Sequence, residues 1–164
     1  MSGDSDRPAA LVAELESARA EFAGVVGGLR RDQLEASRLV GEWGVHEIIA
    51  HLGYWAGNAA EALHQAEIGA AHGFGVDDAE VEERNAVVAR VARETDLATV
   101  RAREAAAFAA LLDRVRRADP NWLDETTSTG ETVGALVRED GIDHYREHAA
   151  DLRIATEGGR HDLV

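Results

Sequence analysis

The chain has 164 residues, of which 45% are hydrophobic, and it carries a formal net charge of −14 with no cysteine. A chain of this length can bury the core of one domain, and its excess of acids argues against binding nucleic acid, which requires clustered cations. Without cysteine, disulfides, thiolate nucleophiles and cysteine-ligated zinc are excluded, and any thiol chemistry needs a thiol cosubstrate.

The hydropathy of the chain bears on its location. No segment approaches the roughly 18 consecutive apolar residues that a transmembrane helix requires. Residues 1–7 are polar and are not followed by the apolar core of a signal peptide. We therefore expect a soluble cytoplasmic protein without membrane contact.

Apolar side chains recur at helical spacing along the first half of the chain. A first helix is predicted from Pro8, a favourable first-turn residue, with an apolar stripe that reaches Leu29. A second helix is predicted to begin at Gly44, with Glu47 in the position of a capping-box acid, and to end near Gly69. Each helix presents one apolar face, as expected for packing against a common core.

The second half of the chain continues the helical pattern. A shorter polar helix is predicted over residues 77–93, a third long helix between Asp96 and Pro120, and a fourth over residues 132–156. Four long amphipathic helices predict an all-α protein, folded as a single four-helix bundle domain over residues 1–164.

Three histidines lie on helix faces that are predicted to be buried. His144 and His148 are four residues apart, so their imidazoles leave one face of the fourth helix one turn apart. His51 shares its face of the second helix with Ile48 and Trp55. Three neutral imidazoles with an open position are a common site for a catalytic divalent metal, with zinc as the first candidate and nickel or iron as others. The alternative is three independently buried histidines, each with its own hydrogen-bond partner.

Carboxylates near the three histidines are candidates for proton transfer. Glu47 precedes His51 by one helical turn, and Glu147 precedes His148 directly in the sequence. We assign catalytic proton transfer to Glu147 and Glu47, and for each one the alternative is a solvated acid on the helix surface. Two further acids at helical spacing from the histidines are candidates for orienting an imidazole: Asp140 and Asp151.

A glycine and several aromatic residues suggest a cleft beside the histidines. Gly141 lies one turn before His144 in the predicted helix, where a glycine costs roughly 1 kcal/mol relative to alanine. Either a close helix contact or a ligand cleft offsets this cost. Trp55 and Tyr54, next to His51, would line such a cleft, and for Trp55 a core position is the alternative. We assign substrate binding to four residues: Trp55, Tyr54, Gly141 and Tyr145.

Two segments of the chain resemble signatures of the DinB/YfiT-like superfamily, and the match in order and spacing covers nearly the whole chain. Residues 40–55 show its tryptophan, helix cap, apolar-acidic turn, Ala-His-Leu and second tryptophan, and residues 144–153 resemble its closing helix. The resemblance implies an up-down-down-up four-helix bundle, often dimeric. It also implies a divalent metal held by three histidines, which map to His51, His144 and His148.

Within this superfamily the chain looks most similar to the colibactin self-resistance type and to the mycothiol-dependent maleylpyruvate isomerase-like branch. It departs from the longer mycothiol enzymes in having no room for a second domain, and Gly44 stands where a serine cap is usual. The first branch implies neutralisation of a reactive electrophile, and the second implies a low-molecular-weight thiol as cosubstrate.

The leading functional hypothesis is a metal-dependent enzyme. A bound metal would activate water or a low-molecular-weight thiol for attack on a reactive electrophilic small molecule, by hydrolysis, thiol transfer or isomerisation, in detoxification or self-resistance. The alternative is a non-catalytic protein that sequesters a reactive metabolite in an aromatic-lined cleft. A third hypothesis is a purely structural dimer module. The expected partners are a small-molecule substrate and a second copy of the chain.

Overall fold

The computed structural model describes residues 6–157, and residues 1–5 and 158–164 of the predicted domain lie outside the described part. Between these limits most of the chain is helical and no strand forms. The prediction of an all-α fold is therefore confirmed. None of the helices in the described part is long and apolar enough to cross a membrane.

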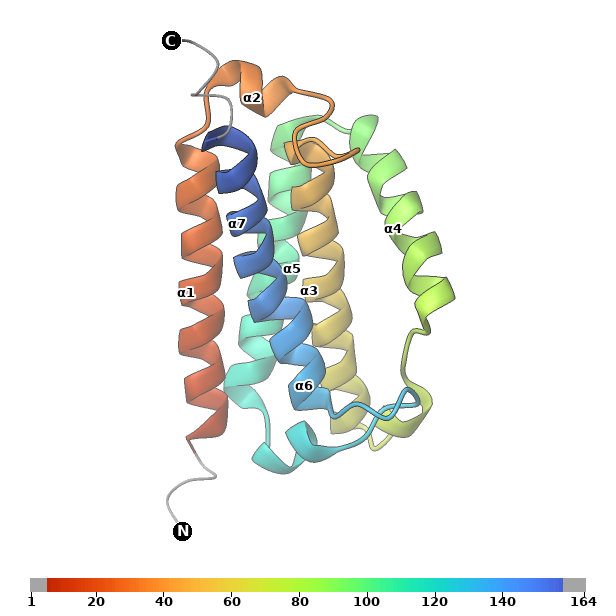
Figure 1. Ribbon diagram of the computed structural model, residues 1–164. Coiled ribbons are helices and arrows are strands. Elements are labelled where there is room, and N and C mark those ends of the chain that lie inside the picture. The colour runs from red at the N-terminus through yellow and green to blue at the C-terminus, as the bar shows by residue number, and fades with distance from the viewer. Residues whose placement is uncertain (1–5, 158–164) are drawn as a thin grey trace.

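Long helices packed side by side make up the bundle (Figure 1). They are α1 (Arg7–Gly27), α3 (Val45–Glu67), α5 (Leu97–Arg117), and the consecutive pair α6 (Val133–Arg138) and α7 (His144–Glu157).

Shorter elements connect and cover the long helices. The helix α4 (Asp78–Arg93) packs on α3 at the side of the bundle, and α2 (Arg31–Glu35) lies near one end of it (Figure 1). Two 3₁₀ turns, η1 (Ala71–Gly73) and η2 (Pro120–Asp124), and one π-helical turn, η3 (Glu139–Asp143), complete the regular structure of the described chain.

The central helix is α3, which contacts α4, α5, α6 and α7. Gly53 permits a close approach to α5, because a Cβ added at this glycine would lie 2.9 Å from the Cα of Glu104. The core between the helices is mostly aliphatic, and its fully or nearly fully buried aromatic members are Phe22, Phe108 and Tyr145. The close approach at Gly53 therefore packs α3 directly against α5.

The beginning of α3 agrees with its local prediction. The backbone N–H of Gly44 donates to Oε2 of Glu47 at 3.2 Å, which confirms Glu47 as the capping-box acid. Arg93, the last residue of α4, donates from Nε to Oε1 of the same carboxylate at 2.9 Å. Glu47 is 4% exposed, so the charge of Arg93 compensates a buried carboxylate at this helix end.

The fourth predicted helix differs from its prediction. In place of one continuous α-helix, α6 ends at Arg138, the π-helical turn η3 follows, and α7 begins at His144. A π-helical turn is wider than an α-helical turn, so it changes the angle between residues on either side of it. In a continuous α-helix Gly141 would lie on the same face as His144. The π-helical turn instead gives Gly141 a different direction from His144.

Candidate metal centre

Three imidazoles from α3 and α7 converge in the interior of the bundle. The ring centres of His51 and His144 are 5.0 Å apart, those of His51 and His148 are 5.1 Å apart, and those of His144 and His148 are 6.0 Å apart. The helical spacing of His144 and His148 places both rings on one face of α7, and the packing of α7 against α3 brings His51 between them.

One nitrogen of each of these rings, Nδ1, is buried without a hydrogen-bond partner among residues 6–157. Nδ1 is buried without a hydrogen bond in His51, His144 and His148, as it also is in His64 outside this group. Nδ1 of His148 lies 3.3 Å from Oδ2 of Asp151, and Nδ1 of His144 lies 4.0 Å from Oδ1 of Asp140, but neither contact is a hydrogen bond. Buried polar atoms normally have partners, so the alternative of three separately satisfied histidines does not describe this group.

Burial keeps the three imidazoles in their neutral form. Desolvation, together with the neighbouring His144 and His148, lowers the pKa of His51 to about 3. Desolvation and His148 lower the pKa of His144 to about 4. Desolvation also lowers the pKa of His148, although the charges of Asp151 and Glu147 oppose it. Neutral imidazole is the form that ligates metal ions or accepts a proton.

The side chains as they stand do not form a ready coordination sphere. Within residues 6–157, no group of three or more histidine, aspartate or glutamate side chains is arranged to hold a metal ion. The three rings are thus close together, but as they stand they do not form such a group.

Two tryptophans flank the histidine group. The ring centre of Trp43 is 4.9 Å from that of His51 and 6.4 Å from that of His148. The ring centre of Trp55 is 6.4 Å from those of both His51 and His144. The sequence prediction included Trp55 but omitted Trp43, which precedes α3 and belongs to no periodic helix face. Its only signal was its place in the segment that resembles the DinB/YfiT-like signature.

The Trp55 indole also contacts polar residues outside the histidine group. Its Nε1 donates to Oδ1 of Asn85 on α4 at 2.9 Å. Trp55 further lines a cavity of about 470 Å³ together with Asn58, Asp140 and the acidic residues Asp77, Asp78, Glu131 and Glu139. This cavity borders the histidine group through Trp55 and Asp140, and it is large enough for a small molecule.

Asp140 is the buried one of the acids that line this cavity. It is 5% exposed, and its Oδ2 accepts a hydrogen bond of 3.0 Å from Nδ2 of Asn58. Desolvation raises the pKa of Asp140 to about 7, against the opposing hydrogen bond from Asn58 and with additional repulsion from Glu139 and Glu131. Neither Asn58 nor Asn85 was singled out from the sequence, because an asparagine on a helix carries no positional signal of its own.

Two residues predicted to bind substrate belong to the core. Gly141 does not border the histidine group, because a Cβ added there would lie 2.6 Å from Cδ2 of Leu15 and 2.9 Å from Cδ2 of Leu111. Tyr145 is fully buried on the other face of α7, where its hydroxyl donates to Oε1 of Glu104 at 2.6 Å. Both assignments are corrected: the π-helical turn directs Gly141 toward α1 and α5, and Tyr145 is one residue, or 100° of helix, away from His144.

The remaining predicted site residues, Tyr54, Glu147 and Glu47, lie in three different places. Tyr54 accepts a hydrogen bond of 2.9 Å from Nη1 of Arg84 and lines a separate cavity between α3, α4 and α5. Glu147 is exposed on α7, near enough for its charge to act on His148. Glu47, one turn before His51, is engaged by Gly44 and Arg93 as described above.

Comparison with known proteins places the chain in a family. No curated protein and no solved structure gives a match. The sequence pattern of the mycothiol maleylpyruvate isomerase N-terminal domain matches residues 15–153, a segment that contains all three converging histidines and both flanking tryptophans. The chain therefore belongs to the mycothiol maleylpyruvate isomerase N-terminal domain family, within the DinB/YfiT-like superfamily.

Proposed function

We propose that His51, His144 and His148 bind one divalent metal ion and that the domain is an enzyme acting on an electrophilic small molecule. The observation that carries this proposal is the convergence of three neutral imidazoles whose buried Nδ1 atoms have no hydrogen-bond partner in the described part of the chain. Zinc is the first candidate, since three histidines and one open position are a frequent catalytic zinc site. Nickel and iron are the other candidates.

The spacing of the rings supports metal binding. A metal at the usual zinc–nitrogen distance lies about 3 Å from the centre of each ligating ring, so tetrahedrally arranged rings have centres about 5 Å apart. The observed separations are 5.0, 5.1 and 6.0 Å. Because no group within residues 6–157 forms a ready site as the side chains stand, binding requires the imidazoles to turn, but it does not require α3 and α7 to move apart.

A divalent metal at this position would lower the pKa of bound water or of an incoming thiol and so supply a nucleophile. Residues around the three histidines would support this chemistry. Asp151 and Asp140 lie beside Nδ1 of His148 and His144 and would orient these imidazoles once they turn toward a metal, Trp43 and Trp55 would shield the ring group from solvent, and exposed Glu147 would carry protons at its edge. The capping role of Glu47 makes it a positioning residue for the start of α3.

The family supports a thiol as the second reactant. The matching pattern is that of a mycothiol-dependent enzyme domain, and the chain has no cysteine of its own, so the thiol would bind as a cosubstrate. The cavity of about 470 Å³ beside Asp140 and Trp55 would hold the small molecule. Hydrolysis, thiol transfer and isomerisation all use this arrangement. The up-down-down-up order of the helices and a homodimer are further parts of the proposal.

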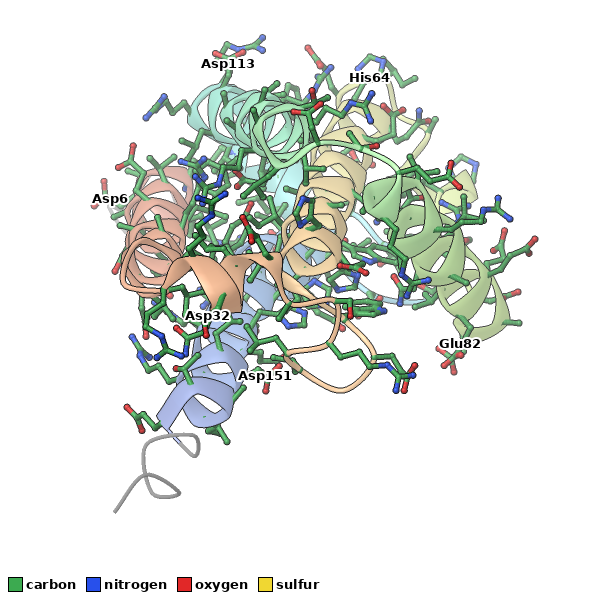
Figure 2. The ribbon with its side chains drawn as sticks, turned by 90° about the horizontal axis from the view of Figure 1, so that it is seen from above. Asp6, Asp32, His64, Glu82, Asp113 and Asp151 are labelled. Carbon is green, nitrogen blue, oxygen red and sulfur yellow. The ribbon has the colours of Figure 1, made fainter. Side chains whose placement is uncertain are left out.

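Metal binding is tested first, on protein purified without a nickel column. We expect elemental analysis to find one divalent metal per chain in the wild type and in the control variant His64→Ala, whose histidine lies on the opposite side of the bundle from Asp151 (Figure 2). His148→Ala should lose the metal. Equal metal content in His148→Ala and His64→Ala would overturn the site.

Catalysis is tested separately on the metal-loaded protein. A thiol-reactive electrophile is incubated with mycothiol, with cysteine or with no thiol, and its loss is followed. Metal-dependent turnover, absent in His148→Ala, is the expected result. If the electrophile binds stoichiometrically without turnover, the enzyme hypothesis is wrong and the protein sequesters its ligand.

A further inference from the structure

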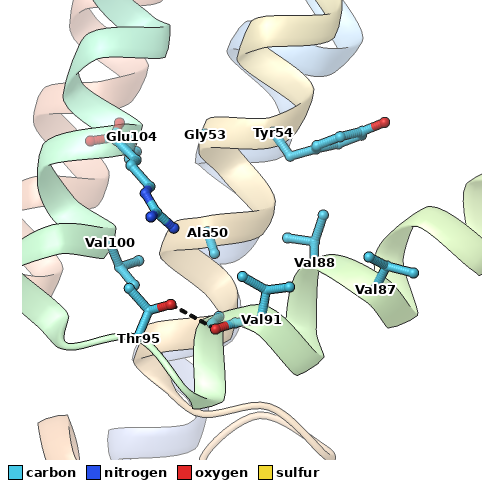
Figure 3. Close-up of a pocket in the computed structure, with 11 residues that line it drawn as sticks. Ala50, Gly53, Tyr54, Val87, Val88, Val91, Thr95, Val100 and Glu104 are labelled. Carbon is cyan, nitrogen blue, oxygen red and sulfur yellow. Dashed lines mark hydrogen bonds between the residues drawn. The ribbon is translucent and has the colours of Figure 1, made fainter.

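A second cavity, of about 320 Å³, lies between α3, α4 and α5. Its walls are mostly valine and alanine, with Ala50 on α3, Val88 and Val91 on α4, and Val100 on α5 (Figure 3). None of the three converging histidines lines it. It is therefore a site distinct from the candidate metal centre.

The cavity exposes apolar surface that the fold does not cover. Val87 and Val91 are 43% and 45% exposed, and both line this cavity. They are two of the four large hydrophobic residues that are exposed in the described part of the chain, with Ile68 and Ile154 as the others. Two exposed valines one helical turn apart on a concave wall are a surface that an apolar group would cover.

One charged group at this cavity lacks a partner. Arg103 on α5 lines the cavity, and it makes no hydrogen bond or ion pair within residues 6–157. The acid beside it, Glu104, is already compensated: Arg19 donates to both of its oxygens at 2.8 Å, and Tyr145 donates to one of them. Figure 3 shows the Glu104 carboxylate pointing away from Val88 and Val91. The cavity thus presents one uncompensated positive charge next to an apolar wall.

We propose that this cavity binds a small amphipathic carboxylate. Its apolar tail lies against Val87, Val88 and Val91, and its carboxylate pairs with the guanidinium of Arg103. A guanidinium fits a carboxylate with two parallel hydrogen bonds. A volume of about 320 Å³ lies at the lower end of small-molecule sites, so the ligand has a short aliphatic or a single aromatic tail.

The test is calorimetric titration with octanoate, octanol and octylamine. The protein carries His148→Ala as a background and is treated with a chelator, so that carboxylate binding to a metal cannot contribute. Octanoate should bind more tightly than either of the other two probes. If octanol binds as tightly as octanoate, the role proposed for the charge of Arg103 is wrong.

Two matched variants separate the charge from its surroundings. Arg103→Gln should weaken octanoate binding at least tenfold and leave octanol binding unchanged, whereas Arg101→Gln, an exposed arginine on the same helix that does not line the cavity, should bind octanoate as before. Equal octanoate affinity in the two variants would refute the assigned contact. Both substitutions are on the surface, and helical circular dichroism checks their folding.

A third variant tests the apolar wall and the competing occupant. Val91→Glu should abolish octanoate binding, while Ile154→Glu, at an exposed isoleucine outside the cavity, should not. Sedimentation of the wild type gives its oligomeric state. If Val91→Glu converts a dimer into a monomer and octanoate does not bind the wild type, the valines are covered by a second copy and the ligand proposal is wrong.

Discussion

The hydroxyl of Tyr145 on α7 donates a hydrogen bond of 2.6 Å to Oε1 of Glu104 on α5. Arg19 on α1 holds the same carboxylate through Nε and Nη2, each at 2.8 Å. Glu104 is 7% exposed, and a buried carboxylate is stable only when it is paired and hydrogen-bonded. Burial and Glu104 also raise the pKa of Tyr145, so the phenol remains a donor. Arg19, Glu104 and Tyr145 thus link α1, α5 and α7, and Tyr145 directly follows His144 in the sequence.

Replacement of Tyr145 by phenylalanine should destabilise the bundle. It leaves one lone pair of a buried carboxylate without its donor, and a hydrogen bond to a charged group contributes about 1.5–3 kcal/mol. We expect a loss of that size in the free energy of unfolding measured with urea. The control is Tyr54→Phe, whose half-buried hydroxyl accepts from Arg84 and whose loss should change stability by no more than about 0.5 kcal/mol. Equal effects of the two substitutions would contradict the structural role of Glu104.

Replacement of Gly141 by alanine should also destabilise the fold. The new Cβ would lie 2.6 Å from Leu15 Cδ2 and 2.9 Å from Leu111 Cδ2, and overpacking of this kind costs about 1–3 kcal/mol, which exceeds the gain of about 1 kcal/mol in helix propensity. Gly57 on α3 is the matched control, since nothing lies within 4 Å of a Cβ added there.

Gly57→Ala should therefore raise the midpoint of urea unfolding, while Gly141→Ala lowers it. Gly141→Leu should be more severe still and should impair folding, so it is unsuitable as a probe of ligand binding. A Gly141→Ala protein as stable as Gly57→Ala would mean that Gly141 faces open space.

Binding of cobalt(II) at the three histidines should quench tryptophan fluorescence. Trp43 lies 4.9 Å from His51 and Trp55 lies 6.4 Å from it, ring centre to ring centre, and quenching by a paramagnetic ion falls steeply with distance. The quenched fraction should drop in Trp43→Phe and in Trp55→Phe. Trp122→Phe, which removes an indole of η2 that has no ring contact with the three histidines in the described chain, should leave a larger quenched fraction than the wild type shows. Unchanged quenching in the Trp43→Phe, Trp55→Phe double variant would place the metal elsewhere.

A bound metal should stabilise the domain without being required for its fold. A ligand that binds only the native state adds about 2.7 kcal/mol at a free concentration one hundred times its Kd. We expect this gain on addition of zinc to chelator-treated protein, measured by thermal unfolding, and no gain in His148→Ala. The helical circular dichroism should be the same with and without metal, because the aliphatic core between the helices does not include the histidines. Loss of helix in the chelated protein would show that the metal is structural.

The local features of this protein follow from its sequence. The all-α class, the capping box at Gly44 and Glu47 and the shared helix face of His144 and His148 are each decided within one helix. Hydrogen bonding between residues a few positions apart and the period of the α-helix produce them. They could therefore be predicted without knowing how the helices pack.

The surroundings of the histidines were decided by the tertiary structure. The period of a helix says which residues share a face, but not which neighbour that face meets, and it holds only while the turn remains α-helical. The π-helical turn at η3 packs Gly141 against Leu15 and Leu111 from two other helices. Trp43 reaches His51 and His148 from a segment without helical periodicity. Both outcomes depend on contacts between residues far apart in the chain, which no local pattern specifies.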